Sequence, residues 1–240
     1  MTADATGATR RDQLAANLGA VRDRIAAACR AADRDPSEVM LVVVTKYFPE
    51  SDVRLLAELG VRDVGENKHQ EAEAKATACA DLDLRWHFVG TLQSNKAAAV
   101  ASYSSVVESV DRAKLLAGLG RGAHRAGRVL DVLVQVSLDL GDAAQGRGGC
   151  PPADVPDLAA RVAATEGLRL RGVMAVAPRD EDPAAAFARL SEVAAGVRAV
   201  DPAATWVSAG MSGDLEQAVR AGATHVRIGS AVLGERPLLR

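Results

Sequence analysis

The chain has 240 residues, of which about half are apolar and a quarter charged, and its formal net charge is −2. That length suits one large α/β domain, and the balanced charge and scarce aromatic residues argue against a nucleic-acid-binding surface. No run approaches the roughly eighteen apolar residues of a membrane span, and the first residues lack the apolar segment of a signal peptide. We therefore expect a cytoplasmic protein with neither nucleic acid nor a membrane as its partner.

The cysteines and histidines give no sign of a disulfide framework or a metal site. The three cysteines are widely separated and form no C-x-x-C pair. Cys29 and Cys79 fall in alanine-rich helical stretches, where we expect them to be small core residues. The four histidines are scattered, and none lies four residues from another. We therefore expect no metal.

Hydrophobic patterning predicts alternating helices and strands after a flexible N-terminus of residues 1–9. Between Arg10 and Ala32 the apolar residues recur at spacings of three and four, which predicts an amphipathic helix. Four consecutive apolar residues then predict a buried strand, Leu41–Lys46. Seven further strands are predicted, and a helix follows each of them except the last. They are Val61–Val64, Trp86–Gly90, Val106–Val110, Val129–Leu138, Leu170–Val176, Trp206–Gly210 and His225–Ser230.

Eight such units predict a single (β/α)8 TIM barrel with an extra N-terminal helix. A doubly wound sheet could be built from the same alternation, but the chain has no Rossmann G-x-G-x-x-G motif. No shift in composition marks an internal boundary, so we expect one domain over residues 10–240. The glycine-rich loop 139–152 is the segment expected to be most mobile, and we assign it no role.

Lys46 lies at the C-terminal end of the first predicted strand, where TIM barrels place functional groups. Burial at that position favours the neutral amine, the form that attacks an aldehyde to give a Schiff base. On this stretch alone the ordinary interpretation is favoured, in which the side chain extends to solvent. The other strand ends shift that balance.

Two turns rich in glycine and serine follow the seventh and eighth predicted strands. These turns are Ser208–Gly213 and Gly229–Ser230. TIM barrels commonly hold a phosphate there, because small residues let backbone N–H groups approach an anion and hydroxyls add donors. Each turn also has an ordinary explanation, since Ser212 could simply cap the following helix. Two such turns opposite a lysine support a phosphate site.

Arg227 lies within the last predicted strand and needs a partner, because an unpaired buried guanidinium is costly. The partner is either a carboxylate in a structural ion pair or the ring nitrogen of a bound cofactor. A lysine that accepts an aldehyde, a phosphate site and an arginine near a ring together indicate pyridoxal 5′-phosphate (PLP).

These motifs resemble the pyridoxal phosphate homeostasis proteins, which are single-domain relatives of the N-terminal barrel of alanine racemase. The resemblance extends in order over nearly the whole chain, from Leu41 to Gly234. Two positions depart from the family pattern, Thr91 and Ala209, and neither removes a group assigned to the cofactor. The matching stretches are Val43–Lys46, Gly65–Asn67, Gln70-Glu71, Trp86–Gly90, Leu92–Lys96, Arg171–Ala175, Ser208–Leu215 and Gly222–Ser230.

The resemblance implies which residues bind PLP. Lys46 would form the Schiff base, Asn67 would lie beside the ring, and Arg227 would face the pyridine nitrogen and keep it unprotonated. His87 and Met174 have either a site role or a packing role. The other cofactor-binding residues, most of them around the phosphate, are Ser208, Met211, Ser212, Gly213, Gly229 and Ser230.

The same resemblance leaves carrier and enzyme functions to be distinguished. Alanine racemase has a second, β-rich domain that supplies a catalytic tyrosine, and ten residues after Ser230 leave no room for such a domain. Tyr47 follows Lys46 directly, so on a strand its side chain would point the opposite way. Tyr103 precedes the fourth strand, at the far end of the barrel. We therefore expect no catalytic residues.

We accordingly expect a PLP-binding protein of intracellular PLP homeostasis, which buffers the cofactor and delivers it to PLP-dependent apo-enzymes without robust turnover. Two alternatives remain. One is a weak PLP-dependent amino-acid racemase with Lys46 as one base. The other is a barrel that binds a sugar phosphate independently of PLP.

Overall fold

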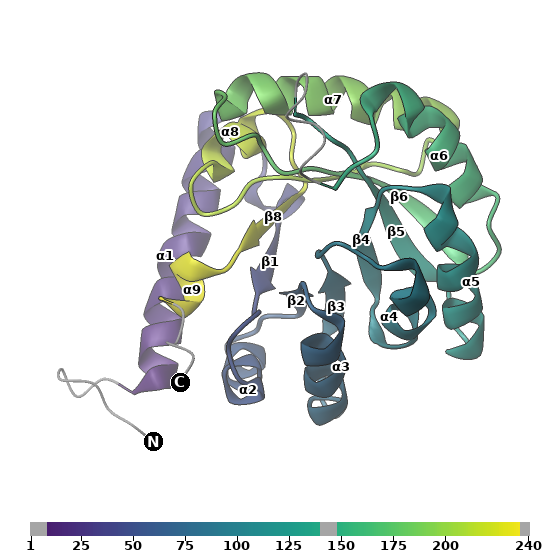
Figure 1. Ribbon diagram of the computed structural model, residues 1–240. Helices are drawn as coiled ribbons and strands as arrows, with labels where there is room; N and C mark the ends of the chain where they lie inside the picture. Colours follow the sequence, from purple (N-terminus) through teal and green to yellow (C-terminus); the bar gives the residue numbers. More distant parts are fainter. Residues whose placement is uncertain (1–8, 140–147, 236–240) are drawn as a thin grey trace.

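In the computed structural model, which describes residues 9–139 and 148–235, eight parallel strands form a closed barrel (Figure 1). Each strand pairs with the next along the chain, and β8 pairs with β1. The predicted (β/α)8 barrel is therefore confirmed. The strands are β1 (Met40–Val44), β2 (Asp63–Glu66), β3 (Arg85–Phe88), β4 (Val106–Val110), β5 (Leu130–Gln135), β6 (Leu168–Met174), β7 (Trp206–Ser208) and β8 (His225–Ile228).

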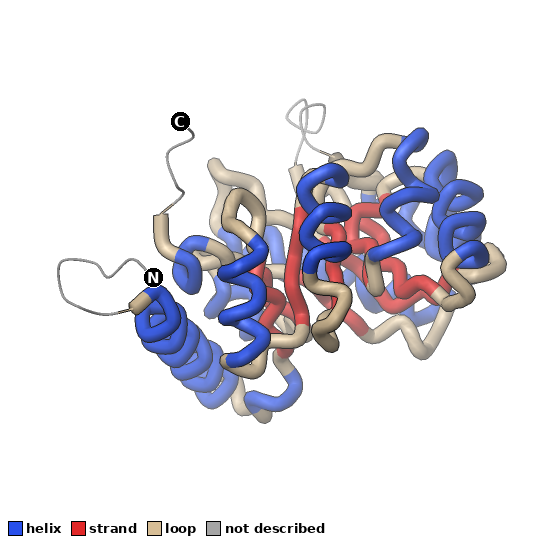
Figure 2. Tube along the Cα trace, turned by 90° about the horizontal axis from the view of Figure 1, so that it is seen from below, coloured by secondary structure: helices blue, strands red, loops and turns tan. Residues whose placement is uncertain are grey.

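Helices surround the strands on the outside of the barrel (Figure 2). Two clusters of buried apolar side chains fill the space between the two layers, one centred on β3–β7 and the other on β1, β2 and β8. The helices are α1 (Arg10–Ala31), α2 (Glu50–Glu58), α3 (His69–Ala78), α4 (Ala97–Tyr103), α5 (Leu116–Arg125), α6 (Val155–Ala163), α7 (Pro183–Val200), α8 (Leu215–Arg220) and α9 (Ser230–Leu233).

The N-terminal helix α1 completes the outer layer. The sequence predicted no helix after the last strand, whereas the structure has the four-residue α9 there, which is too short to cover the seam between β8 and β1. The 22-residue α1 packs beside α8 and α9 instead (Figure 1). Its buried face, which includes Leu14, Leu18 and Ile25, belongs to the apolar cluster of β1 and β8. The predicted extra helix is thus a structural part of the barrel.

Polar contacts from α1 also hold the segments that follow β7 and β8. Arg24 Nη1 donates to the carbonyl oxygen of Ser212 at 2.7 Å. Asn17 Nδ2 donates to the carbonyl oxygen of Val232 at 3.0 Å. Because both segments lie at the C-terminal end of the barrel, α1 helps to fix the chain at the end where barrel sites form.

Several strand boundaries differ from those predicted. β1 ends at Val44, so Lys46 lies two residues beyond the strand, and β5 ends at Gln135 rather than at Leu138. Val136 and Leu138 are nevertheless buried. Apolar patterning reports burial, and burial continues beyond the point where the hydrogen-bond ladder stops.

Two predicted segments fall wholly or largely outside the described residues. They are the flexible N-terminus, of which only Thr9 is described, and the loop 139–152, of which residues 140–147 are not described. Thr9 forms a capping box with Asp12 at the start of α1. Within the described part of the chain, no helix is long and apolar enough to cross a membrane.

The middle of β6 contains an irregularity at Gly172. The register between β5 and β6 shifts between Val132 and Leu133, and Gly172 has a φ of 146°. A Cβ added there would lie 1.9 Å from the carbonyl oxygen of Trp206. Only glycine therefore fits where β6 approaches β7.

Gly172→Ala should lower the free energy of unfolding by about 3 kcal/mol or more, because both the backbone angle and the space exclude a side chain. Gly196→Ala is the control, since nothing lies within 4 Å of a Cβ added to this residue of α7. It should raise stability by about 0.5–1 kcal/mol. Urea unfolding, followed by circular dichroism, measures the free energy of unfolding of both variants. Equal stability of Gly172→Ala and the unchanged protein would contradict the conclusion that only glycine fits at this position.

Candidate functional site

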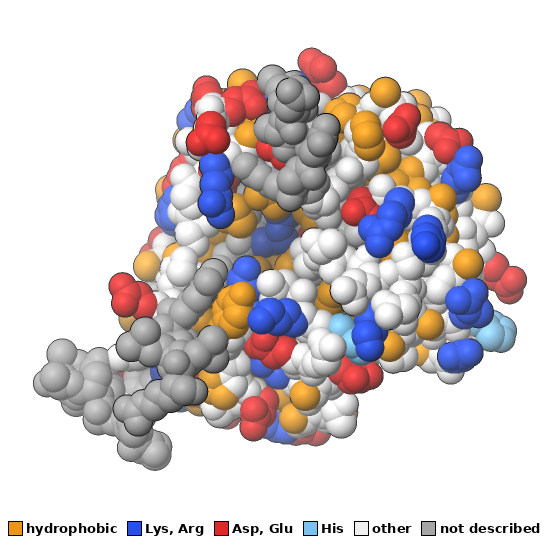
Figure 3. All heavy atoms as spheres, in the orientation of Figure 1, with side chains coloured by type: hydrophobic (Ala, Val, Ile, Leu, Met, Phe, Trp, Pro, Cys, Tyr) orange, Lys and Arg blue, Asp and Glu red, His pale blue; other side chains and the backbone are white. Residues whose placement is uncertain are grey.

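A cavity of about 510 Å³ opens at the C-terminal end of the barrel. Its size lies within the range of small-molecule sites, roughly 300–1,000 Å³. The hollow near the centre of Figure 3 has Lys or Arg atoms at its floor. The lining includes eight of the residues expected to bind a cofactor, namely Lys46, Asn67, Met211, Ser212, Gly213, Arg227, Gly229 and Ser230.

Adjacent strands bring the two most chemically distinctive residues together. β1 pairs with β8 in parallel, with Val42 opposite Arg227. Lys46 follows β1 and is half-buried, whereas Arg227 is 5% exposed within β8. The hydroxyls of Ser212, after β7, and Ser230, after β8, lie 3.4 Å apart. All four of these side chains carry N–H or O–H donors, which can bind an anion or an aromatic ring nitrogen.

Ser208 lies elsewhere. It was expected to help hold a phosphate, but its side chain is fully buried inside the barrel and does not line the cavity. Its hydroxyl donates to Glu108 Oε2 at 2.6 Å and accepts from Arg227 Nη1 at 2.7 Å. Strand β7 ends at Ser208, so the side chain points to the barrel axis, and the turn toward the cavity begins after it. Its observed role is to hold Arg227.

Tyr47 also differs from the expectation. The inference that it points away from Lys46 assumed that both residues lie on a strand, but the strand has already ended. Tyr47 has a φ of 72°, in the left-handed region, and its side chain lines the cavity with Lys46. The ring centroid lies 5.9 Å from Lys46 Nζ and 5.3 Å from Lys68 Nζ.

Asn67 lies directly against Gly90, which follows β3 by two residues. A Cβ on Gly90 would lie 2.1 Å from the carbonyl oxygen of Asn67, so this close approach excludes any side chain. The Asn67 Oδ1 atom is buried and has no hydrogen-bond partner among the described residues. A buried acceptor without a partner, on a residue that lines a cavity, indicates a group that binds a ligand.

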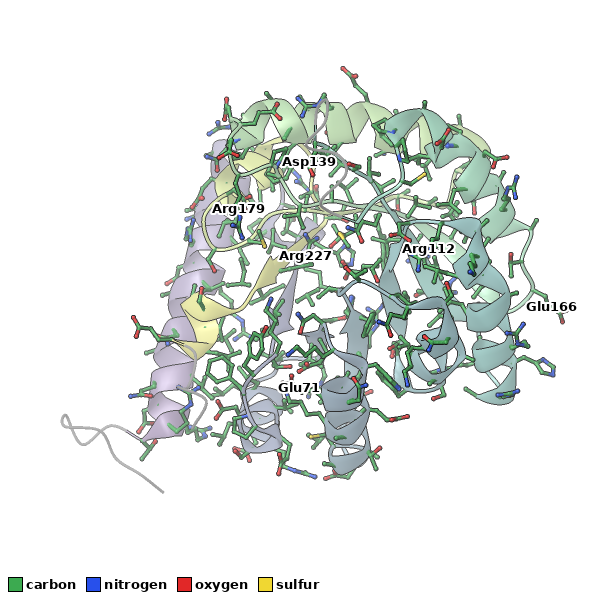
Figure 4. The ribbon with its side chains drawn as sticks, in the orientation of Figure 1. Glu71, Arg112, Asp139, Glu166, Arg179 and Arg227 are labelled. Carbon is green, nitrogen blue, oxygen red and sulfur yellow. The ribbon has the colours of Figure 1, made fainter. Side chains whose placement is uncertain are left out.

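A row of buried polar side chains crosses the barrel and ends at Arg227, which is labelled near the centre of Figure 4. His87 contacts Asp63 Oδ1 through Nε2 at 2.9 Å and Glu108 Oε1 through Nδ1 at 2.7 Å. Glu108 in turn lies 3.8 Å from Arg227 Nη1, with Ser208 bonded to both. Arg227 Nη2 donates to the carbonyl oxygen of Ala175 at 2.7 Å.

His87 must carry a positive charge in this arrangement. Each ring nitrogen faces a carboxylate oxygen, which only accepts hydrogen bonds, so both nitrogens donate. Burial alone would lower the pKa of His87, but its hydrogen bonds to Asp63 and Glu108 outweigh burial and raise it. Burial alone would likewise raise the pKa of Glu108, yet His87 and Arg227 lower it to about 2. Along this row of side chains the charges therefore alternate: Asp63 is negative, His87 positive, Glu108 negative and Arg227 positive.

The sequence analysis did not identify the two carboxylates of this row, Asp63 and Glu108. Glu108 stands in the strand Val106–Val110, three of whose five residues are valine, and it is fully buried. A carboxylate in the middle of an apolar strand requires a buried cationic partner, and that signal was available from the sequence. His87 was left with either a site role or a packing role, and the structure places it below the cavity, where it orders Arg227 through Glu108. Met174 lines the cavity itself.

Comparison with known proteins places the chain in a family. The family model described as alanine racemase, N-terminal domain, matches residues 16–237. The chain belongs to this family. The pyridoxal phosphate homeostasis protein of Mycobacterium tuberculosis H37Rv is 43% identical over 245 residues, which cover 95% of each chain. The protein of the same name from Escherichia coli K12 is 36% identical over 236 residues, 94% of this chain and 97% of that protein.

A solved structure of a relative has the same fold. PipY of Synechococcus elongatus PCC7942, in its PLP-bound structure, is 33% identical to this chain, with a TM-score of 0.79. The match covers 92% of this chain and all of PipY. These matches confirm the family resemblance drawn from the sequence motifs.

The pKa values of the two histidines inside the barrel, His87 and His225, should be shifted in opposite directions. Burial lowers the pKa of His225 to about 4, so its imidazole should stay neutral well below pH 6.5, whereas His87 should stay charged above that pH. Two-dimensional NMR of the ring nitrogens, with each histidine assigned by substitution with Gln, measures both. A His87 that loses its proton below pH 6.5 would contradict the charge pattern.

Proposed function

We propose that this protein binds PLP as a Schiff base on Lys46 and serves intracellular PLP homeostasis by holding the cofactor and delivering it to PLP-dependent enzymes. The observation that carries the proposal is the convergence, in one cavity, of an amine, a guanidinium and a pair of hydroxyls. They belong to Lys46, Arg227, Ser212 and Ser230. Those are the groups needed for an aldehyde, a pyridine nitrogen and a phosphate.

The residues present fit PLP. The Ser212 and Ser230 hydroxyls converge from two different strands, as expected for donors to one phosphate. Arg227 uses one N–H of each terminal nitrogen on Ser208 and Ala175, and each of these nitrogens carries a second N–H. Asn67 offers a buried acceptor without a described partner. The relatives named for PLP homeostasis and the PLP-bound PipY structure support the same conclusion.

Each group would act on a different part of the cofactor. When bound, PLP supplies an aldehyde that condenses with an amine. Lys46 provides that amine. Arg227 presents a fixed positive charge to the ring nitrogen and opposes its protonation, which weakens the ring as an electron sink. Gly213 and Gly229 allow backbone N–H groups to approach the phosphate beside the two serines.

A weak amino-acid racemase is the second candidate, and Tyr47 favours it. Moving a proton between the two faces of a substrate carbon requires two acid–base groups. The structure brings the Tyr47 ring into the cavity beside Lys46, where the sequence analysis expected no tyrosine. Carriage is the preferred function because the relatives at 43% and 36% identity are both named pyridoxal phosphate homeostasis proteins.

Borohydride treatment of the PLP-loaded protein should attach a pyridoxyl group to Lys46 and abolish the visible absorption of the complex. Lys46→Ala should lose both signals. Lys68→Ala is the matched control and should keep them, since Lys68 flanks the same Tyr47 ring. Absorbance before and after reduction, with peptide mapping by mass spectrometry, measures the result. A folded protein that takes up no PLP would contradict the proposal and favour a sugar-phosphate barrel.

Hydrogen exchange at the α-carbon of amino acids distinguishes the two candidates. We expect the PLP-loaded protein in D₂O to exchange that hydrogen no faster than free PLP does, because a carrier has no need for a second acid–base group. NMR of alanine incubated with the protein measures the rate. Rapid exchange that Tyr47→Phe abolishes would establish the racemase instead.

A further inference from the structure

We propose that Glu71 and Lys75 of α3 are positioning residues for Lys46, holding the peptide groups on either side of it in one fixed conformation. The proposal deepens the proposed function and rests on the assignment of Lys46 as the residue that binds PLP. In Figure 4 Glu71 lies between α2 and α3, away from the central position of Arg227.

The backbone around Lys46 needs such support because it is neither strand nor helix. The last ladder contact is Thr45 N–H to the carbonyl oxygen of Gly65, at 2.9 Å. A tight turn follows, closed by the Phe48 N–H donating to the Thr45 carbonyl oxygen at 3.1 Å. Within that turn Tyr47 has a positive φ of 72°, which a residue with a Cβ adopts only when its surroundings enforce it.

Two side chains of α3 bond the peptide groups that flank Lys46. On one side, Lys75 Nζ donates to the carbonyl oxygen of Thr45 at 2.8 Å. On the other side, the Tyr47 N–H donates to Glu71 Oε1 at 2.6 Å. Lys75 Nζ also donates to that Glu71 oxygen at 2.7 Å, so the two contacts form one connected unit. The backbone is therefore held immediately before and immediately after Lys46.

Lys75 and Glu66 are buried in this unit, and Glu71 is partly exposed. The Lys75 side chain is 7% exposed, and its third contact is Glu66 Oε1 at 2.7 Å. Glu66 Oε1 also accepts from the Thr45 hydroxyl at 2.6 Å. An ammonium has three N–H groups, and Lys75 places one on each of three oxygens. Lys75 is therefore fixed, because any other arrangement of this buried ammonium leaves an N–H group without a partner.

A purely structural role explains only part of the cluster. The Lys75–Glu66 pair alone would join α3 to β2. The bond from Tyr47 N–H to Glu71 adds nothing to that junction, but it does fix the residue after Lys46. The effect is to orient the Lys46 amine before the cofactor arrives. The conformational entropy of Lys46 is then lost during folding rather than during binding.

The first test reads the Tyr47 amide in the PLP-free protein. Its exchange with solvent deuterium, followed by NMR, should be about tenfold faster in Glu71→Ala, because the charged acceptor is lost. Glu73→Ala is the matched control on the same helix. Glu73 is exposed, and its ion-pair contact is with His69 at 3.7 Å. We expect that control to leave the Tyr47 exchange rate within about twofold of the unchanged protein.

The second test measures how fast PLP becomes trappable on Lys46 by borohydride. Glu71→Ala and Lys75→Met should both slow this step about tenfold, since the amine is no longer oriented. Glu71→Gln, which keeps an oxygen for the Tyr47 N–H, should recover part of the rate. Glu73→Ala should match the unchanged protein. If Lys75→Met fails to fold, the trapping rates of Glu71→Ala and Glu71→Gln still test the inference, because Glu71 is partly exposed.

Three results would overturn the inference, and each has a separate meaning. Equal Tyr47 exchange in Glu71→Ala and Glu73→Ala would show that the Glu71 contact does not hold the backbone. Faster exchange with unchanged trapping would show that the contact is structural only, while the proposed function stands. Failure to trap PLP on Lys46 in the unchanged protein, with normal Tyr47 protection, would remove the proposed function and leave the contact without that role.

Discussion

The interaction on which the site depends is the pairing of Arg227 with Glu108 at the axis of the barrel. A guanidinium buried this deeply is tolerated only with a compensating charge. Glu108 supplies that charge at 3.8 Å, and Ser208 is hydrogen-bonded to both side chains. Glu108 is itself stabilised as an anion by the His87 cation, which is balanced by Asp63. Because the charges alternate along the chain, the positive end at Arg227 faces the cavity.

The barrel makes this arrangement possible by bringing distant parts of the sequence to one axis. The row of buried polar side chains has five members, which come from β2, β3, β4, β7 and β8. They are Asp63, His87, Glu108, Ser208 and Arg227. No single stretch of sequence could bring these charges together. The outer layer serves the same end of the barrel, since α1 fills the seam beside α9 and bonds the turn that contains Ser212.

The sequence predicted the fold and most of the cavity lining, because these depend on local pattern. Apolar periodicity gave the eight strands, and the small-residue turns after β7 and β8 gave the lining at Ser212 and Ser230. Ser208 was expected in the turn, but it is the last residue of its strand, so its side chain points to the barrel axis. A shift of one position along the chain changes the side-chain direction in this way. Tyr47 was misplaced because a positive φ reverses the side-chain direction expected from strand alternation. Long-range charge pairing, as at Glu108, was not read from the local pattern.

Two lysines close to the end of β1, Lys46 just after the strand and Lys75 on α3, have different surroundings. Lys75 is surrounded by three oxygen acceptors, two of them carboxylates, so each of its three N–H groups has a partner. Lys46 forms no ion pair with any carboxylate of the described residues, and its neighbour is the Tyr47 ring. The residue whose charge is left uncompensated lines the cavity, and the compensated one holds the backbone beneath it. The amine that we propose to bind an aldehyde is the former.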